Sequence, residues 1–242
     1  MLLNMAGGGA SKEFPEFTYT GSYQFLDDGN KNWRIKFLTS GTLTFTKLGS
    51  AKNGIDVFLV GGGGCGIWAM PGAGGYTFTN KHIIPNATTN YSIVIGAGST
   101  SDTGQGGTSS AFGSSAKGGY SGKHATYPGT GGTGAPIGYN NNGSSDGANG
   151  KNASGNAGKG QGTTTREFGE SGAALYAGSG ASTTSATTTY YGGAGGGGNV
   201  EGGNAMAGAA NTGGGGAGSG AGTDKIQAAN GGSGIVIIRN AR

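Results

Sequence analysis

The side chains able to perform catalysis or to bind a metal are few and widely spaced in this sequence. It contains two histidines, His82 and His124, and one cysteine, Cys65. A Cys65–His124 nucleophilic pair is an open hypothesis, although we expect Cys65 to fill a small site among the glycines of residues 61–66. A zinc centre needs three or four Cys, His or carboxylate ligands at recognisable spacing, which this sequence does not provide. We therefore expect no enzymatic activity, no metal site and no cofactor.

Glycine-containing segments resemble ligand-binding loops, but each lacks a residue that the loop requires. Gly96 and Gly98 follow an expected strand, as in a dinucleotide loop, yet position 101 is serine and no helix follows. Lys159 lies between glycines without the Ser or Thr that follows the lysine of a P-loop. The acidic cluster at residues 27–30 lacks the later bidentate glutamate of an EF-hand and is interpreted as a turn.

Tyrosines among small polar residues are the remaining candidates for binding. Tyrosine with Ser, Gly and Asn is typical of antibody loops, because it supplies contact area at low entropic cost. Tyr190 and Tyr191 follow the Ser/Thr-rich run at residues 182–189, and we predict a recognition tip there. Tyr127 and Tyr139 are further candidates for receptor binding. The alternative is that each tyrosine caps the edge of packed glycine segments.

Glycine dominates the composition, with 60 of 242 residues, against a usual share of about 7%. A helical protein is excluded, since each interior glycine costs a helix about 1 kcal/mol relative to alanine. Collagen is excluded because the chain has only five prolines and does not place glycine at every third position. The net charge is +4, but lysines and arginines form no patch, so we expect no nucleic-acid partner. No apolar run approaches membrane-spanning length, and no signal peptide is recognisable, so we expect no membrane insertion.

The composition divides the chain into four parts: an arm (1–12), a β domain (13–112), a glycine-rich excursion (113–233) and a closing strand (234–242). Alternation of large apolar and basic residues at 33–37 predicts a strand with one wet face. Short strands separated by Gly, Asn and Pro turns favour an all-β fold, specifically a β-sandwich. The β-branched residues 235–238 predict a buried strand that pairs with the β domain and tethers the excursion at both ends.

Residues 113–233 have too few large apolar side chains for a conventional core. Disorder is one interpretation of such a composition. The other is a lattice of polyglycine II helices, which are extended, have three residues per turn and pack closely because glycine has no side chain. Residues 192–198 and 213–220 are the expected core segments of that lattice.

The strand signatures carry a resemblance to a known family. Residues 39–45 and 55–64 resemble the glycine-rich domain of bacteriophage tail-fibre and other virion proteins, as do residues 74–77, 91–98 and the ending at 231–239. The resemblance implies a β-sandwich carrying polyglycine II helices, in a virion protein that contacts the host surface. Tail fibre, tail tip, baseplate and capsid fibre all stay open.

These observations together predict a non-enzymatic virion protein, most simply a tail-associated fibre or tip component that touches a host glycan or surface protein. Other tail or baseplate proteins would be its partners, with residues 1–12 as the attachment. By analogy with tail fibres we expect a homo-oligomer, possibly a trimer, located on the virion after assembly in the host cytoplasm. The alternatives are a capsid decoration or head fibre with a structural role, a bacterial surface protein and a host-wall hydrolase.

Overall fold

The protein is built from short β-strands and turns. The computed structural model describes residues 14–122, 131–135, 140–147, 161–220 and 227–242, and these contain strands and three 3-10 helices but no α-helix. The 3-10 helices are η1 (Gly49–Asn53), η2 (Gly162–Thr165) and η3 (Glu167–Gly169). The fold is therefore all-β, as the composition predicted.

The largest sheet has five antiparallel strands in the order β2-β3-β16-β5-β7. Their bounds are β2 (Tyr23–Gly29), β3 (Asn32–Phe37), β16 (Ile235–Asn240), β5 (Ile55–Val60) and β7 (Thr77–Ile83). The last strand of the chain is thus central, between two strands formed some 180 and 200 residues earlier.

A second, three-stranded sheet has the order β1-β4-β8 and is also antiparallel. It consists of β1 (Glu16–Tyr19), β4 (Gly41–Lys47) and β8 (Asn90–Ile93), and the hairpin of β9 (Ser109–Ala111) and β10 (Ser114–Ala116) lies nearby. Side chains of both sheets share one core, to which each strand contributes alternate residues. Its largest fully buried members are Trp33, Ile35, Phe37, Leu43, Phe45, Ile55, Leu59, Ile93 and Ile238.

The central strand β16 is buried on both faces. Val236 and Ile238 point into the core shared by the two sheets, whereas Ile235 and Ile237 pack against a second cluster. That second cluster contains Phe58 of β5 with Phe168 and Tyr176 from the segment that covers the sheet. Four consecutive β-branched residues suit this strand because neither face meets water.

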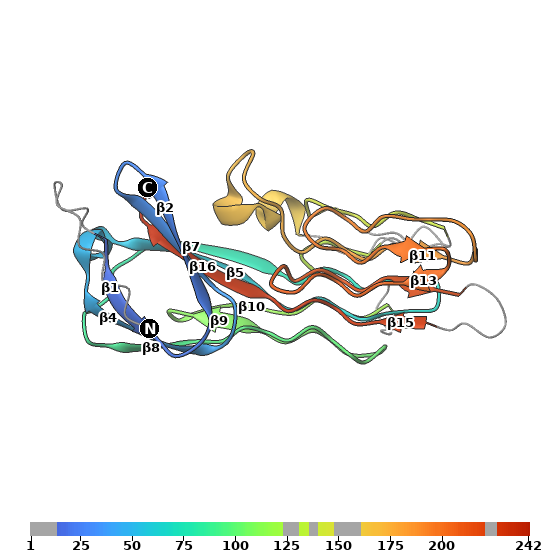
Figure 1. Cartoon of the computed structure of the whole chain (residues 1–242), viewed down its shortest axis with the longest axis horizontal. Helices are drawn as coiled ribbons and strands as arrows, with labels where there is room; N and C mark the ends of the chain where they lie inside the picture. The colour runs from blue at the N-terminus through green and yellow to red at the C-terminus, as the bar shows by residue number, and fades with distance from the viewer. Residues whose placement is uncertain (1–13, 123–130, 136–139, 148–160, 221–226) are drawn as a thin grey trace.

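The molecule is elongated, and Figure 1 shows how the parts are arranged. The two larger sheets and both ends of the traced chain lie in one half. Extended segments run along the long axis into the other half and turn back there. These segments include glycine runs on both sides of residue 113, among them residues 61–66, 72–75 and 213–218.

Backbone amides in these segments bond to several neighbours in turn. Gly61 and Gly64 donate to Tyr76 and Ala73 on one neighbouring segment, at 2.9 and 2.8 Å. The amides between them turn elsewhere, Gly62 to Gly107 and Gly63 to Gly232, each at 2.9 Å. Each segment is therefore surrounded by others, and every third amide returns to the same partner.

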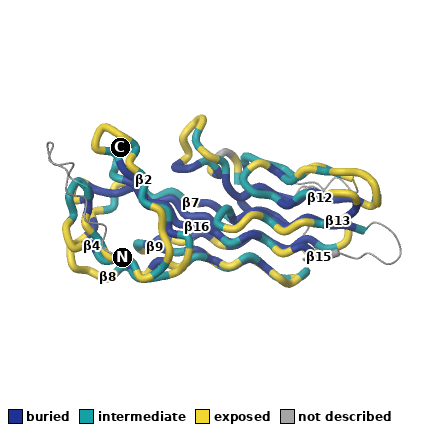
Figure 2. Tube along the Cα trace, in the orientation of Figure 1, coloured by how far each residue is buried: buried dark blue, intermediate teal, exposed yellow. Residues whose placement is uncertain are grey.

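The segments approach so closely that side chains are excluded. A Cβ atom placed on Gly63 would lie 1.9 Å from the carbonyl oxygen of Gly214, and one on Gly75 would lie 2.0 Å from that of Gly61. Figure 2 shows buried stretches continuing along this half of the molecule. Backbone packed on backbone replaces the side-chain core here.

The two glycine runs expected as core segments differ from each other. Residues 213–219 are buried throughout, as expected, but residues 192–198 are interrupted by a turn at 194–196. Gly195 and Gly196 have φ of 97° and 92°, so the chain reverses there and continues beside its own earlier residues. Glycine serves the second run as a turn former rather than as one straight segment.

The far end of the molecule carries a small four-stranded sheet, β11-β14-β15-β6. Its strands are β11 (Ser182–Thr183), β14 (Gly218–Ser219), β15 (Gln227–Ala229) and β6 (Gly66–Ile67). The hairpin of β12 (Val200–Glu201) and β13 (Asn204–Ala205) lies beside it.

Candidate functional site

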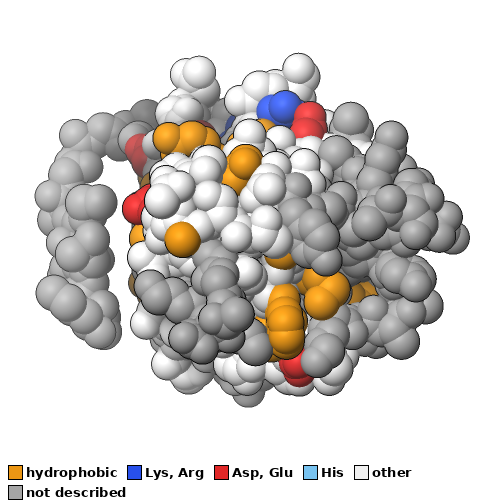
Figure 3. Space-filling model, turned by 90° about the vertical axis from the view of Figure 1, so that its right-hand side faces the viewer, with side chains coloured by type: hydrophobic (Ala, Val, Ile, Leu, Met, Phe, Trp, Pro, Cys, Tyr) orange, Lys and Arg blue, Asp and Glu red, His pale blue; other side chains and the backbone are white. Residues whose placement is uncertain are grey.

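The far end of the molecule, which we call the distal tip, is defined by residues 66–70, 182–191 and 218–220. None of these residues is charged. Among the described atoms at this end, Figure 3 shows mostly uncharged polar side chains and backbone, with several hydrophobic patches and a few charged side chains. These three described segments therefore offer neutral polar contacts.

A hydroxyl-rich loop, residues 184–189, leaves β11 at this end and is exposed over most of its length. Its conformation is fixed locally: the Thr184 amide donates to Asn140 Oδ1 at 3.0 Å, and the Ser185 amide donates to Thr183 Oγ1 at 2.9 Å. Ser185 and Thr188 share a hydrogen bond at 3.0 Å between their hydroxyls. Such local bonds hold Ser/Thr loops in shape without a core.

Tyr190 and Tyr191 end this loop, but the structure gives them different environments. The ring of Tyr190 is half-buried against Ala181, Val200 and Ala217, and its backbone pairs with Val200. Tyr191 is 64% exposed, although its amide donates to Asn142 Oδ1 at 2.9 Å. Tyr190 thus packs at the edge of the glycine segments, while Tyr191 presents its ring to solvent.

Tyr127 and Tyr139, the other two predicted receptor-binding residues, lie outside the described residues. The same holds for His124, so the Cys65–His124 hypothesis is not tested. Cys65 itself is buried, and burial raises the pKa of its thiol above the usual value. A raised pKa disfavours the thiolate that nucleophilic chemistry needs.

Trp68 is a tip residue that sequence reasoning missed. Its side chain is 45% exposed, and its φ is 54°. It lies at the turn of a two-residue hairpin closed by Ile67 and Met70, whose backbones exchange hydrogen bonds of 2.8 and 2.9 Å. A large aromatic residue inside a glycine-rich stretch was the available signal, since an ordinary turn there would use glycine.

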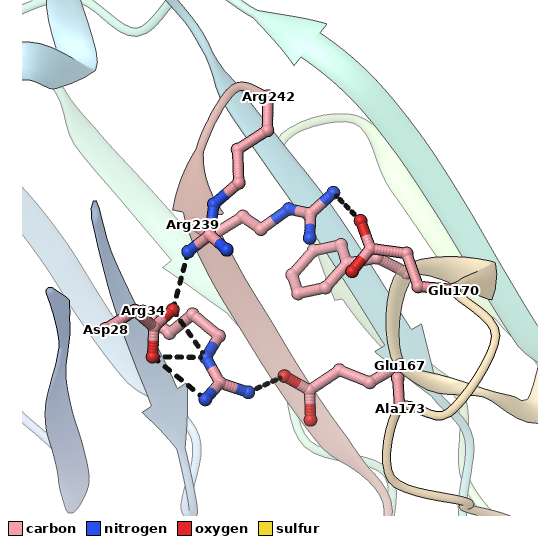
Figure 4. A pocket seen from close by; sticks show the side chains of 8 residues that line it. Asp28, Arg34, Glu167, Glu170, Ala173, Arg239 and Arg242 are labelled. Carbon is pink, nitrogen blue, oxygen red and sulfur yellow. Dashed lines mark hydrogen bonds and ion pairs between the residues drawn. The ribbon is translucent and has the colours of Figure 1, made fainter. Parts of the chain in front are cut away.

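A charged pocket of about 220 Å³ lies between β2, the end of β16 and the segment around η3 (Figure 4). Arg34 bonds both to Asp28, at 2.9 Å, and to Glu167. Arg239 bonds to buried Asp56 at 3.1 Å and to Glu170 at 2.7 Å, and its guanidinium lies 4.1 Å from the Phe168 ring centroid.

The ion pairs of this pocket shift the titration of its carboxyl groups. Burial raises the pKa of Asp28, but hydrogen bonds and charge from Arg34 and Arg242 outweigh it and lower that pKa below its usual value. The hydrogen bond from Arg239 lowers the pKa of Glu170. Because each arginine already has a carboxylate partner, the pocket is best interpreted as a clamp that holds the η3 segment on the sheet.

The described residues contain no group of three or more His, Cys, Asp or Glu side chains placed to hold a metal ion. No helix in the described part of the chain has the length and apolar character needed to cross a membrane.

A family described as "Glycine-rich domain" matches residues 38–241, which is most of the chain. This protein therefore belongs to the glycine-rich domain family, and its interleaved glycine segments give that description a structural meaning. No curated protein and no solved structure shows a significant match to it.

Proposed function

We propose that this protein is a structural component of a bacteriophage virion, a tail-associated fibre or tip part that contacts the host cell surface. The observation that supports it is that the two ends of the elongated molecule differ. The traced chain ends lie in one half, with the two larger sheets (Figure 1). Exposed Tyr191, exposed Trp68 and the hydroxyl-rich loop lie at the opposite end, where residues 66–70, 182–191 and 218–220 carry no charge.

We further propose that the two larger sheets form a β-sandwich and that the glycine segments are polyglycine II helices. The shared core between the five-stranded and three-stranded sheets supports the first part. The return of every third amide to the same neighbour supports the second, because polyglycine II has three residues per turn. Such a lattice would carry the tip on a stiff body that exposes little cleavable chain.

In this proposal the other half of the molecule faces the virion. Residues 1–12 would attach to a neighbouring tail or baseplate protein, and copies of the chain would associate as a homo-oligomer, possibly a trimer. The host-side partner would be a surface glycan or protein.

Adsorption of particles that carry Tyr191→Ala tests the proposal. We expect adsorption to fall by about tenfold or more, because Tyr191 exposes 64% of its surface and its removal disturbs little packing. Phe78→Ala is the matched control. Phe78 is also an exposed aromatic residue, at 44%, but it lies on β7 and is not one of the residues that define the distal tip. Normal adsorption by the Tyr191 variant would contradict the site.

Location of the chain on the particle separates the proposal from its alternative. A fusion tag visible by electron microscopy at the tail tip would agree with host contact. A tag found over the head surface would instead indicate a capsid decoration or head fibre with a structural role.

A further inference from the structure

Trp68 occupies a backbone position that normally belongs to glycine. In the hairpin between Ile67 and Met70, Trp68 has a positive φ of 54° and Ala69 does not. That is the pattern of a type II′ turn, whose first central residue is usually glycine. A bulky residue held in this region is strained, and such strain gathers at functional sites.

Packing does not account for the tryptophan. Trp68 belongs to none of the three buried clusters formed by the described residues, and 45% of its surface is exposed. The chain places glycine at 60 other positions, so a glycine at this turn would be the unstrained choice. The exposed ring of Trp68 is therefore the feature that a glycine at this turn could not supply.

The hydroxyl-rich loop and the Trp68 turn both adjoin strand β14. Gly220, just beyond β14, donates its amide to Thr183 at 2.9 Å, directly before residues 184–189. Within β14 itself, a Cβ on Gly218 would lie 2.5 Å from the Trp68 carbonyl oxygen. The backbone of the Trp68 turn and the first residues of the loop therefore both contact β14, at the same end of the molecule.

We propose that Trp68 and residues 184–189 form a binding site for a neutral saccharide. The apolar face of a sugar ring would stack on the indole, and its hydroxyls would exchange hydrogen bonds with Thr184, Ser185 and the threonines that follow. This inference rests on the proposed host contact and assigns a ligand class to it.

Other ligand classes fit the tip less well. A phosphorylated or sulfated ligand would find no cation among tip residues 66–70, 182–191 and 218–220. A protein partner of ordinary affinity covers about 800 Å² per side with an apolar centre, whereas residues 184–189 all carry hydroxyls except Ala186.

Tryptophan fluorescence of the full chain offers a direct test. The probe is soluble polysaccharide released from the host surface and separated by anion exchange into neutral and anionic fractions. The chain has two tryptophans, and Trp33 is fully buried, so a change on adding saccharide reports Trp68. We expect the neutral fraction to shift the emission and the anionic fraction to have no effect.

Two variants make the result specific. Trp68→Gly should lose binding of the neutral fraction at least tenfold, measured by calorimetry, yet fold with a thermal midpoint within about 3 °C of the parent, since glycine suits a positive φ. Trp68→Phe keeps a ring and should retain part of the affinity, and Phe78→Ala should bind normally. Unchanged binding by Trp68→Gly, or binding of the anionic fraction alone, would overturn the saccharide site.

Binding of the purified chain to intact host cells separates this inference from the proposed function. Cell binding that protease treatment abolishes, with no response to the neutral fraction, would overturn the saccharide site and leave host contact standing. No binding to cells in any form would overturn the proposed function itself. Cell binding that periodate oxidation of the surface sugars abolishes, and that Trp68→Gly loses, would support both.

Discussion

At the scale of single residues, many glycines are required because another segment's carbonyl oxygen lies where a Cβ atom would be. Gly63 is such a case, with the Gly214 oxygen 1.9 Å from the position of a Cβ. Both groups are backbone, so neither can move aside as a flexible side chain would. The requirement comes from space at this position rather than from an unusual φ.

Gly63→Ala is therefore expected to destabilise the protein by about 3 kcal/mol or more, as overpacking does at its upper end. Gly220→Ala is the matched control, because its Cβ would meet nothing closer than 3.4 Å, and its effect should stay within about 0.5 kcal/mol. Urea unfolding of the two variants measures the difference. Equal stabilities would contradict backbone-on-backbone packing at Gly63.

A second prediction at the scale of single residues concerns the buried ion pair of Asp56 and Arg239, whose side chains are 0% and 2% exposed. Asp56→Ala should cost about 3–5 kcal/mol of unfolding free energy, because a buried arginine loses a carboxylate that offsets its charge. The exposed Lys47–Glu16 pair gives the comparison, and Lys47→Ala should cost no more than about 0.5 kcal/mol. Thermal or urea unfolding distinguishes these outcomes. A loss of unfolding free energy for Asp56→Ala as small as that for Lys47→Ala would contradict the prediction.

At the scale of elements, the η3 segment is held on the sheet by carboxylates with lowered pKa values. Asp28 and Glu170 have folded-state pKa values below their usual ones, so their contribution to stability is present above about pH 4 and disappears as pH falls through those lowered values.

The urea midpoint should therefore fall between pH 5 and pH 2, and the fall should be smaller in Glu170→Gln. An identical acid response in Glu170→Gln would show that this clamp is not linked to stability.

The closing strand β16 is the second element whose role is testable. It bonds to β3 on one side and β5 on the other, so the sheet has no continuous hydrogen bonding without it. Removal of residues 234–242 should yield protein that is rapidly digested and lacks a cooperative thermal transition. Removal of residues 241–242 alone should cost little, because it loses mainly the Arg242–Asp28 contact.

At the scale of the whole molecule, the two halves are joined by continuous chain rather than by a linker. Strand β5 runs directly into the glycines at 61–64, and residues 231–234 of the glycine region run directly into β16. Calorimetry should therefore give one unfolding transition for both halves. Two separate transitions, or early proteolysis confined to the described glycine segments, would show that the halves fold independently.

Part of this architecture could be predicted from the sequence because it depends on local pattern. The glycine content excludes helices, alternation at residues 33–37 marks a strand, and the β-branched run at 235–238 marks a strand buried on both faces. These features need only the chemistry of neighbouring residues.

Tertiary structure decided which glycine segments lie together, because glycine runs carry no side chains that specify a partner. The hydrogen bonds of residues 61–64 to segments around 75, 107 and 232 could not be deduced from composition, nor could the turn at 194–196 within a glycine run. The same holds for Trp68, whose importance comes from a positive φ and from a turn that contacts β14 beside the hydroxyl-rich loop. Sequence alone determined the glycine-rich composition and several strands. Long-range packing determined which segments lie side by side and which residues form the distal tip.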